Sequence, residues 1–336
     1  MPAAQTRVPT YVLYTPVLRS SHLERLAPVP GFRLLASGRH PDCDDELLAA
    51  APFPVLLATA EELEADLAAR PPDVLEITEP LWTAQWAPSL RLADAAPTAA
   101  LVTYAIEVLP PATAPPAGRL RAVAYGSAAA EQAYAVSYPA AGWVTTVVEE
   151  RRGRCLSCFP GAADRAPAER ELVFAAEFSE RKAIDLLLAA WEAAAPPGWR
   201  LRLLGWGPRT DAVLAWAAGQ AEVDVVVGAG REVVHDAMRR AAAVVLPSRR
   251  VPGWREQIGL SIVEGLAHGC HVVATDETGL AAGLAADGHT VLPAGDGPAL
   301  VAALAALPGL PADKALPPAA DDSRRRAQAW LATAAR

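Results

Sequence analysis

ELVFAAEFSERKAIDLLLAAWEAAAPPGWRLRLLG, residues 171–205, contains two short apolar runs on either side of a stretch with helical periodicity. The runs at 172–175 and 201–204 are typical of strands that are buried on both faces of a sheet. Between them, the apolar residues of 183–194 recur at the spacing of one helix face. A strand, a helix and a second strand of this kind predict a β-α-β unit with parallel strands.

The same alternation continues to residue 307. Further strands are expected at 223–227, 243–246, 271–274 and 290–292, and further helices at 211–218, 232–241, 258–268, 280–286 and 298–307. Glycine or proline follows several of these strands, where a parallel sheet places its ligand-binding loops. The pattern predicts a doubly wound α/β domain at residues 165–315.

The N-terminal half has a similar pattern with short connections. Strands are expected at 11–14, 33–36, 55–58, 74–77, 99–104, 120–125 and 144–148. Because the connections are rich in proline, we expect some of the crossovers to be loops instead of helices. The breaks in the pattern predict an N-terminal domain at 1–155 and a closing C-terminal helix at 321–336, which starts with an acidic cap.

The charge of the chain excludes several classes of partner. The chain has 336 residues and a net charge of −8, and residues 1–150 hold 9 of the 30 basic and 17 of the 38 acidic residues. The N-terminal half therefore carries the whole negative charge, which argues against binding to nucleic acid or to an anionic membrane. No run is long and apolar enough for a membrane anchor, and no secretory signal is evident. We expect a cytoplasmic protein.

Lysine is rare in this chain. Lys182 and Lys314 are the only lysines among 30 basic residues, and the rest are arginine. Abundant arginine and alanine indicate the coding bias of a GC-rich genome, so arginine counts carry little information. A lysine in such a chain is more informative.

Four cysteines, Cys43, Cys155, Cys158 and Cys270, are too few for a disulfide scaffold in a chain of this length. Cys155 and Cys158 have the C-x-x-C spacing of thiol-exchange sites and of half a zinc site. A structural zinc site needs a second pair of ligands, and no Cys or His pair of suitable spacing is present. The pair also does not open a helix after a strand. We therefore interpret both cysteines as small residues of the linker between domains.

Asp42 and Asp44 have the D-x-D spacing through which some transferases hold a divalent metal. Asp44 also precedes the predicted helical segment at 47–51, where an acidic side chain caps the helix and complements its dipole. The cap explains the position without a further partner. We therefore expect a site that is independent of metal.

Two G-x-G sequences follow predicted strands, as the glycines of dinucleotide-binding sites do. They begin at Gly205 and Gly228, and each lacks the third glycine of the dinucleotide fingerprint. Tight turns are the better interpretation of both. A nicotinamide-dependent oxidoreductase is therefore disfavoured.

The stretch PSRRVPGWREQIGLSIVEGLAHG, residues 247–269, is the strongest functional feature. A strand ends at Pro247 and a helix is expected to begin near Ile258, so Glu256 precedes that helix and Glu264 lies inside it. Fully helical spacing would separate the two carboxylates by about 12 Å. That arrangement suits an elongated ligand with hydroxyls at both ends, whose anionic middle would face the helix amides. The alternative is one solvated glutamate and one glutamate between domains.

Residues 171 to about 307 resemble the nucleotide-binding domain of the retaining glycosyltransferases of family 4. The spacing Glu256-x7-Glu264 matches the E-x7-E motif of that family, and the runs that begin at Ser179, Leu201 and Val272 fall in the expected order. The resemblance implies the α/β GT-B fold, in which two Rossmann-like parallel-sheet domains face each other across a cleft. The N-terminal domain would then bind the acceptor.

The resemblance also implies substrates. The donor would be a nucleotide-diphosphate sugar, with a UDP-sugar favoured, which acts as a co-substrate with no bound cofactor. The acceptor would be a hydroxyl of a small molecule, and the acidic N-terminal half favours a soluble one.

Individual roles follow from the same resemblance. Glu264 would hold the ribose of the donor, and the catalytic residues would be Lys182, which neutralises the diphosphate, and Glu256, which contacts the sugar. The other expected donor-binding residues are Gly259, Leu260, Ser261, Arg181, Gly228 and Arg231, the last two near the base.

One departure stands at the end of the first strand of this domain. The family usually has Gly-Arg there, and this chain has Ala176 and Glu177. A carboxylate thus replaces a cation that would bind the diphosphate. Arg181 is expected to project from a different side than Lys182. The departure leaves an alternative open: a catalytically silent GT-B-like protein that binds a nucleotide or stabilises a partner.

Overall fold

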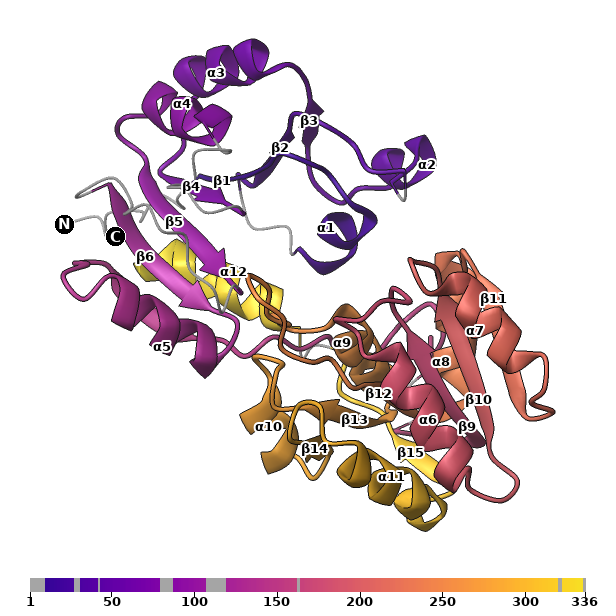
Figure 1. Ribbon diagram of the computed structural model, residues 1–336. Helices are drawn as coiled ribbons and strands as arrows, with labels where there is room; N and C mark the ends of the chain where they lie inside the picture. The colour runs from indigo at the N-terminus through magenta and orange to yellow at the C-terminus, as the bar shows by residue number, and fades with distance from the viewer. Residues whose placement is uncertain are drawn as a thin grey trace. The chain divides into compact units, whose positions relative to one another are not determined.

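The computed structural model describes residues 10–26, 31–41, 43–78, 87–106, 119–161, 164–319 and 322–334. The chain divides into two compact units (Figure 1), Met1–Val148 with Ser323–Arg336 and Glu149–Asp322. In the described ranges, no helix is long and apolar enough to cross a membrane.

The first unit is built on a parallel sheet. Among its described residues the sheet has seven strands, in the order β3-β2-β1-β4-β5-β6-β7. These are β1 (Tyr11–Thr15), β2 (Arg33–Ala36), β3 (Val55–Leu57), β4 (Val74–Ile77), β5 (Ala100–Ala105), β6 (Leu120–Tyr125) and β7 (Val144–Val147). Each lies where an apolar run predicts a strand. The central strands β1 and β4 are buried along their whole length, as expected for a sheet that is covered on both faces.

Helices connect the strands of this sheet. They are α1 (Ser20–Arg25), α2 (Asp45–Ala49), α3 (Ala60–Ala69), α4 (Ala87–Ala95) and α5 (Ala128–Ser137). Residues 107–118, which join β5 to β6, are outside the described residues. A helix lies in each of the other connections of this sheet, so the expectation that some crossovers are loops rests on the connection from β5 to β6 and stays a prediction.

Asp44 caps one of these helices. Its side chain accepts a hydrogen bond of 2.8 Å from the amide of Leu47, at the start of α2. The cap predicted at this position is therefore confirmed. Asp42, the other half of the D-x-D spacing, is outside the described residues.

The last helix belongs to the first unit. Helix α12 (Ser323–Ala334) lies against β5 and β6 (Figure 1). Ala327 and Leu331 are fully buried there, in the same core cluster as Tyr11. The sequence predicts an acidic cap pair at 321 and 322. Residue 321 is outside the described residues, and Asp322 is buried directly before the helix.

The same helix forms a buried ion pair with the sheet. Arg324 Nη2 donates to Glu76 Oε1 at 2.5 Å, and the Tyr11 hydroxyl donates to Glu76 Oε2 at 2.5 Å. Glu76 is completely buried, and Arg324 also lies 5.4 Å from the ring centre of Tyr104. The partners satisfy a carboxylate that burial would otherwise make very unfavourable.

The second unit contains a second parallel sheet. Its described part has six strands in the order β11-β10-β9-β12-β13-β14. They are β9 (Glu169–Ala175), β10 (Arg200–Gly205), β11 (Val223–Val227), β12 (Ala241–Leu246), β13 (His271–Thr275) and β14 (Thr290–Leu292), each within three residues of its predicted ends. The helices are α6 (Ile184–Ala194), α7 (Thr210–Ala217), α8 (Arg231–Arg240), α9 (Leu260–Ala267), α10 (Ala281–Ala286) and α11 (Gly297–Ala306).

The strand order of this sheet predicts where a ligand binds. The chain moves outward from β9 to β11 and then returns to the other side of β9 with β12. In open parallel sheets, ligands bind beyond the carboxyl ends of the strands at such a reversal. The loops that follow β9 and β12 carry the predicted residues Lys182 and Glu256.

A small antiparallel sheet was not predicted. Strand β8 (Arg165–Pro167) pairs with β15 (Asp313–Ala315). Each has three residues and no alternation of apolar and polar side chains, so neither gives a strand signal.

Candidate functional site

The site is centred on the first turn of α9. Gly259 precedes this helix with φ 73°, a conformation that favours glycine. A Cβ atom here would lie 2.7 Å from Leu246 Cδ2 and 2.9 Å from Ile262 Cδ1. The first amides of a helix have no partner within it and carry a partial positive charge. The predicted residues Leu260 and Ser261 are therefore placed to present amides to an anion.

A pocket of about 550 Å³ opens beside this turn. Its lining residues are Ala175, Ala176, Glu177, Arg181, Leu204, Gly205, Trp206, Ala229, Val234, Leu260, Ser261 and Glu264. Four of the predicted residues thus lie in one cavity, which has the size of a site for a metabolite. A separate pocket of about 490 Å³, lined among others by His271, His289 and Lys314, contains none of them.

Lys182 and Glu256 form an ion pair. The Nζ atom of Lys182 donates to Oε2 of Glu256, and the Ser248 hydroxyl donates to the same oxygen at 2.6 Å. Only 13% of the lysine side chain and 8% of the glutamate side chain are exposed. The pair joins the loop after β9 to the loop after β12, so the two expected catalytic residues are brought together.

The cations of the first loop lie against one aromatic ring. Arg181 Cζ is 4.8 Å and Lys182 Nζ is 5.1 Å from the ring centre of Trp254. Of the two, Arg181 lines the pocket and Lys182 pairs with Glu256, so the expectation that they project from different sides stays a prediction. Sequence reasoning gave Trp254 no role.

Glu177 holds Arg181. Arg181 Nε donates to Glu177 Oε2 at 2.9 Å, and both side chains line the pocket. Glu177, which stands where an arginine was expected, therefore also neutralises the charge of Arg181.

Glu264 has a cationic partner that sequence reasoning missed. Arg152 Nη1 donates to Glu264 Oε1 at 3.2 Å. Arg152 belongs to the sequence RRGR at 151–154, which interrupts the alternation of strands and helices and carries no signal beyond its charge. The 12 Å separation expected for Glu256 and Glu264 assumed continuous helix, but α9 begins only at Leu260. Glu256 belongs to the preceding loop and is buried there.

Gly228 and Arg231 lie next to the pocket and do not line it. Gly228 follows β11 with φ 68°, and Arg231 is the first residue of α8. Ala229 and Val234, on either side of Arg231, do line the cavity.

The glycines after β10 have a packing role. A Cβ atom on Gly205 would lie 1.9 Å from the carbonyl oxygen of Ala176, and one on Gly207 would lie 2.6 Å from that of Phe178. Only glycine permits the loops after β9 and β10 to approach this closely. Gly205 itself is the last residue of β10, so close packing explains this glycine.

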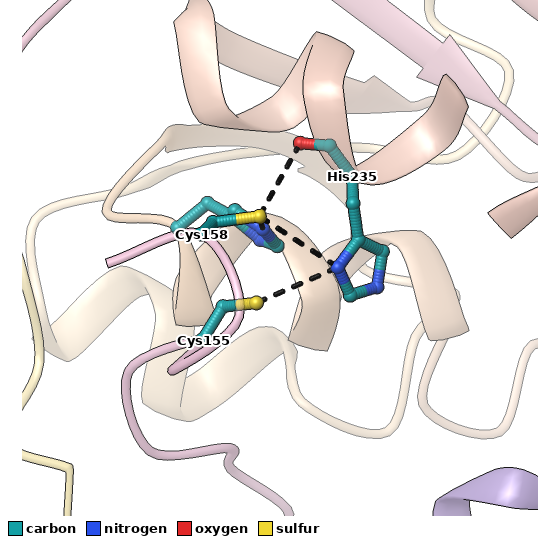
Figure 2. A group of neighbouring side chains, drawn as sticks. Cys155, Cys158 and His235 are labelled. Atoms are coloured by element: carbon teal, nitrogen blue, oxygen red, sulfur yellow. Dashed lines mark hydrogen bonds between the residues drawn. The ribbon is translucent and has the colours of Figure 1, made fainter. Parts of the chain in front are cut away.

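Two cysteines and two histidines meet elsewhere in this unit. Their ligand-type atoms, from Cys155, Cys158, His235 and His268, all lie within 4.8 Å of one another. Figure 2 shows both thiols facing the ring of His235. The expectation that no second ligand pair is available is wrong, because it compared spacings along the chain, and the histidines come from two different helices.

The two thiols differ in acidity. Burial raises the pKa of Cys155, but hydrogen bonds with His235 and His268 outweigh burial and lower it to about 4. Burial and the neighbouring Cys155 raise the pKa of Cys158 to about 11. One thiolate next to two imidazoles is thus favoured.

Comparison with known proteins identifies the type of domain. Residues 169–308 match the family model described as glycosyl transferases group 1. A sequence search of curated proteins found no match.

Solved structures with the same fold are numerous. Anabaena HepE in complex with UDP has a TM-score of 0.65 at 14% identity, over 96% of this chain and 95% of that one. A glycosyltransferase from Rickettsia africae has a TM-score of 0.65 at 12% identity, over 98% and 94%. AviGT4, a glycosyltransferase involved in avilamycin A biosynthesis, has a TM-score of 0.59 at 20% identity, over 97% and 95%.

These findings confirm two of the predictions. The α/β fold with two parallel sheets is that of the GT-B glycosyltransferases. The expected enzyme class, a glycosyltransferase, is confirmed for the domain that the family model covers.

Proposed function

We propose that the chain is a retaining glycosyltransferase of family 4 that moves a sugar from a UDP-sugar to a hydroxyl of a soluble small molecule. The observation that carries the proposal is the pocket at the start of α9, which collects Arg181, Leu260, Ser261 and Glu264. The UDP complex of HepE, a protein of the same fold, supports this choice of nucleotide.

The pocket offers a partner to each part of such a donor. The carboxylate of Glu264 accepts hydrogen bonds from the ribose hydroxyls, which requires that its contact with Arg152 opens or is shared. The amides that follow Gly259 bind the diphosphate at the helix N-terminus. The base lies beside Gly228 and Arg231.

The reaction needs charge stabilisation above all. The bond between the sugar carbon and the diphosphate oxygen breaks, and the acceptor oxygen forms a new bond to that carbon on the same face. The proton of the acceptor hydroxyl passes to the departing phosphate oxygen. Lys182 and the amides of α9 stabilise the charge of the diphosphate, and Glu256 orients the sugar. A bound metal ion has no place in this scheme.

The ion pair between Glu177 and Arg181 favours a second candidate function. With Arg181 neutralised, the pocket would bind a nucleotide without turnover, as a catalytically silent GT-B-like protein. Release of UDP from any UDP-sugar, with or without an acceptor, excludes this alternative.

Calorimetric titration with UDP, GDP and dTDP in the absence of metal tests the donor site. We expect UDP to bind, and the Glu264→Ala variant to lose about 1.5–3 kcal/mol of binding free energy, as for hydrogen bonds to a charged group. Glu222→Ala, an exposed glutamate beside β11, is the matched control and should bind like the wild type. Absence of binding to all three nucleotides would remove the proposal.

A change at Glu177 should strengthen nucleotide binding. Glu177→Gln releases Arg181 and removes a negative charge from the pocket, so we expect the Kd for UDP to fall by about 3- to 10-fold at low salt. Because roughly a third of each side chain is exposed, added salt should reduce the gain. Uridine, which has no phosphate, should bind equally to both proteins. An equal gain for uridine would contradict this explanation.

A further inference from the structure

Three segments far apart in the sequence meet at the cysteine and histidine cluster. Cys155 and Cys158 flank a turn before β8, His235 lies in α8, and His268 is the residue that ends α9. His235 Nδ1 is 3.5 Å from Cys155 Sγ and 3.8 Å from Cys158 Sγ, and His268 Nε2 is 3.3 Å from Cys158 Sγ. All four side chains therefore direct a ligand-type atom toward one point.

These distances fit a tetrahedral metal ion. Zinc bonds of about 2.3 Å to sulfur and about 2.0–2.1 Å to nitrogen place the ligand atoms roughly 3.3–3.8 Å apart. The three sulfur–nitrogen distances fall in that range, and the largest separation in the cluster is within 4.8 Å. Binding of an ion would therefore need the most widely separated ligand atoms to approach each other by at most about 1.5 Å.

The histidine rings are oriented as in metal sites. His268 Nδ1 lies 2.7 Å from the carbonyl oxygen of Glu264. A carbonyl only accepts, so the proton is on Nδ1, and the lone pair of Nε2 faces Cys158. A backbone carbonyl that fixes the tautomer of a ligating histidine is a common outer-shell contact. His268 is itself buried, with 1% exposed.

The cluster is poorly satisfied without an ion. The contact between Cys158 Sγ and His235 Nδ1, at 3.8 Å, is near the upper limit for a hydrogen bond to sulfur. Burial of polar groups with weak partners costs free energy. Two thiolates and two imidazoles suit Zn²⁺, whereas Mg²⁺ and Ca²⁺ take oxygen ligands.

We propose that Cys155, Cys158, His235 and His268 bind one Zn²⁺ ion in a closed, structural site. Four protein ligands leave no open position for catalysis. The ion joins the turn at 155–158 to α8 and α9, where the amide of Cys155 already donates to the carbonyl of Ala267 at 3.0 Å. Helix α9 begins at the proposed donor site, and His268 follows its last residue. The ion therefore holds in place the helix that carries the donor site.

The metal content of the full chain tests the proposal. Protein purified under reducing conditions with added Zn²⁺ should hold one zinc per chain by elemental mass spectrometry. Its Co²⁺ form should show the intense absorption of a tetrahedral thiolate site. Cys158→Ser and His268→Gln should each lose the ion, whereas the controls Cys43→Ala and His271→Gln should keep it. His271 is a suitable control because its ring contacts Thr290 at 2.9 Å, outside the cluster.

The wild-type protein gives an answer even if the variants fail to fold. Chelation of the ion should lower the Tm by at least about 5 °C, and added zinc should restore it. The proposal is overturned if the wild type holds no zinc, or if both ligand variants keep it. A Cys155–Cys158 disulfide in metal-free protein would overturn it in favour of thiol exchange. Metal binding is measured without nucleotide, so this result is separate from that of the donor titration.

Discussion

Replacing Lys182 with methionine is expected to lower kcat/KM for a UDP-sugar by about 100- to 1000-fold, the usual effect of removing one group that stabilises transition-state charge. Lys182 lies at the carboxyl end of β9, where the strand order places a ligand, and its charge is held by Glu256. The variant keeps an unbranched side chain of similar length and loses the cation, together with its contact with the Trp254 ring.

The substitution also breaks the ion pair between Lys182 and Glu256. Lys182→Met leaves Glu256 buried with Ser248 as its remaining partner among the described residues, which destabilises the loop after β12. The double variant Lys182→Met with Glu256→Gln removes both charges, so it should recover the stability and not the activity. Lys182→Arg, which keeps the charge, should retain part of the activity. Wild-type kcat/KM in the double variant would contradict the role of Lys182.

Replacing Arg324 with methionine is expected to lower the free energy of unfolding of the first unit by about 3–5 kcal/mol, as for other buried ion pairs that lose one partner. The variant leaves the Glu76 carboxylate completely buried, with the Tyr11 hydroxyl as its remaining hydrogen-bond donor among the described residues. Hydrogen exchange of peptides from β4 and β6 measures the stability of the first unit alone. The unfolding of the second unit therefore does not contribute to the measured value.

Two controls separate lost charge from lost packing. The double variant Arg324→Met with Glu76→Gln should lose much less than Arg324→Met alone, since no ion is then left unpaired. Arg325→Met changes the exposed neighbour on the same helix and should have little effect. If the single and double variants at Glu76 and Arg324 are equally destabilised, the ion pair is not the cause.

The strands were predictable because the sheets are buried on both faces. Strand β12, for example, is buried at all six of its residues, and its sequence AAAVVL contains no polar interruption. Strands β8 and β15 were not predictable, because a three-residue pair outside the main sheets is determined by its partner and not by its own pattern.

Some residues of the candidate site were also predictable from the sequence, and others were not. Leu260, Ser261 and Glu264 follow from one continuous stretch of sequence, and all three line one pocket. Arg152 lies about a hundred residues before that stretch, and Trp254 lies within it but outside the E-x7-E spacing. The proposed metal ligands lie on separate segments 33 or more positions apart. Contacts of this kind depend on tertiary packing and leave no periodic signal. Glu76 is similar: an acid inside an apolar strand signals a buried partner without identifying it.

The rarity of lysine in the sequence correctly indicated that each lysine has a specific role. Lys182 belongs to the candidate site, and Lys314 is buried and donates to the carbonyls of Met238 at 2.7 Å and Ala241 at 3.0 Å. The second lysine thus satisfies carbonyls at the end of α8, the helix that carries His235.

The return of α12 to the first sheet also affects how the protein folds during synthesis. A ribosome makes β1 to β7, then the whole second unit, and only then the helix that covers β5 and β6. Domains normally fold in order as they emerge, but here the first to emerge is the last to be completed. Until then Ala122 and Ala124 lack the cover of Ala327 and Leu331. Stalled chains that end before Ser323 should therefore be cut by protease in the first unit while the second unit resists.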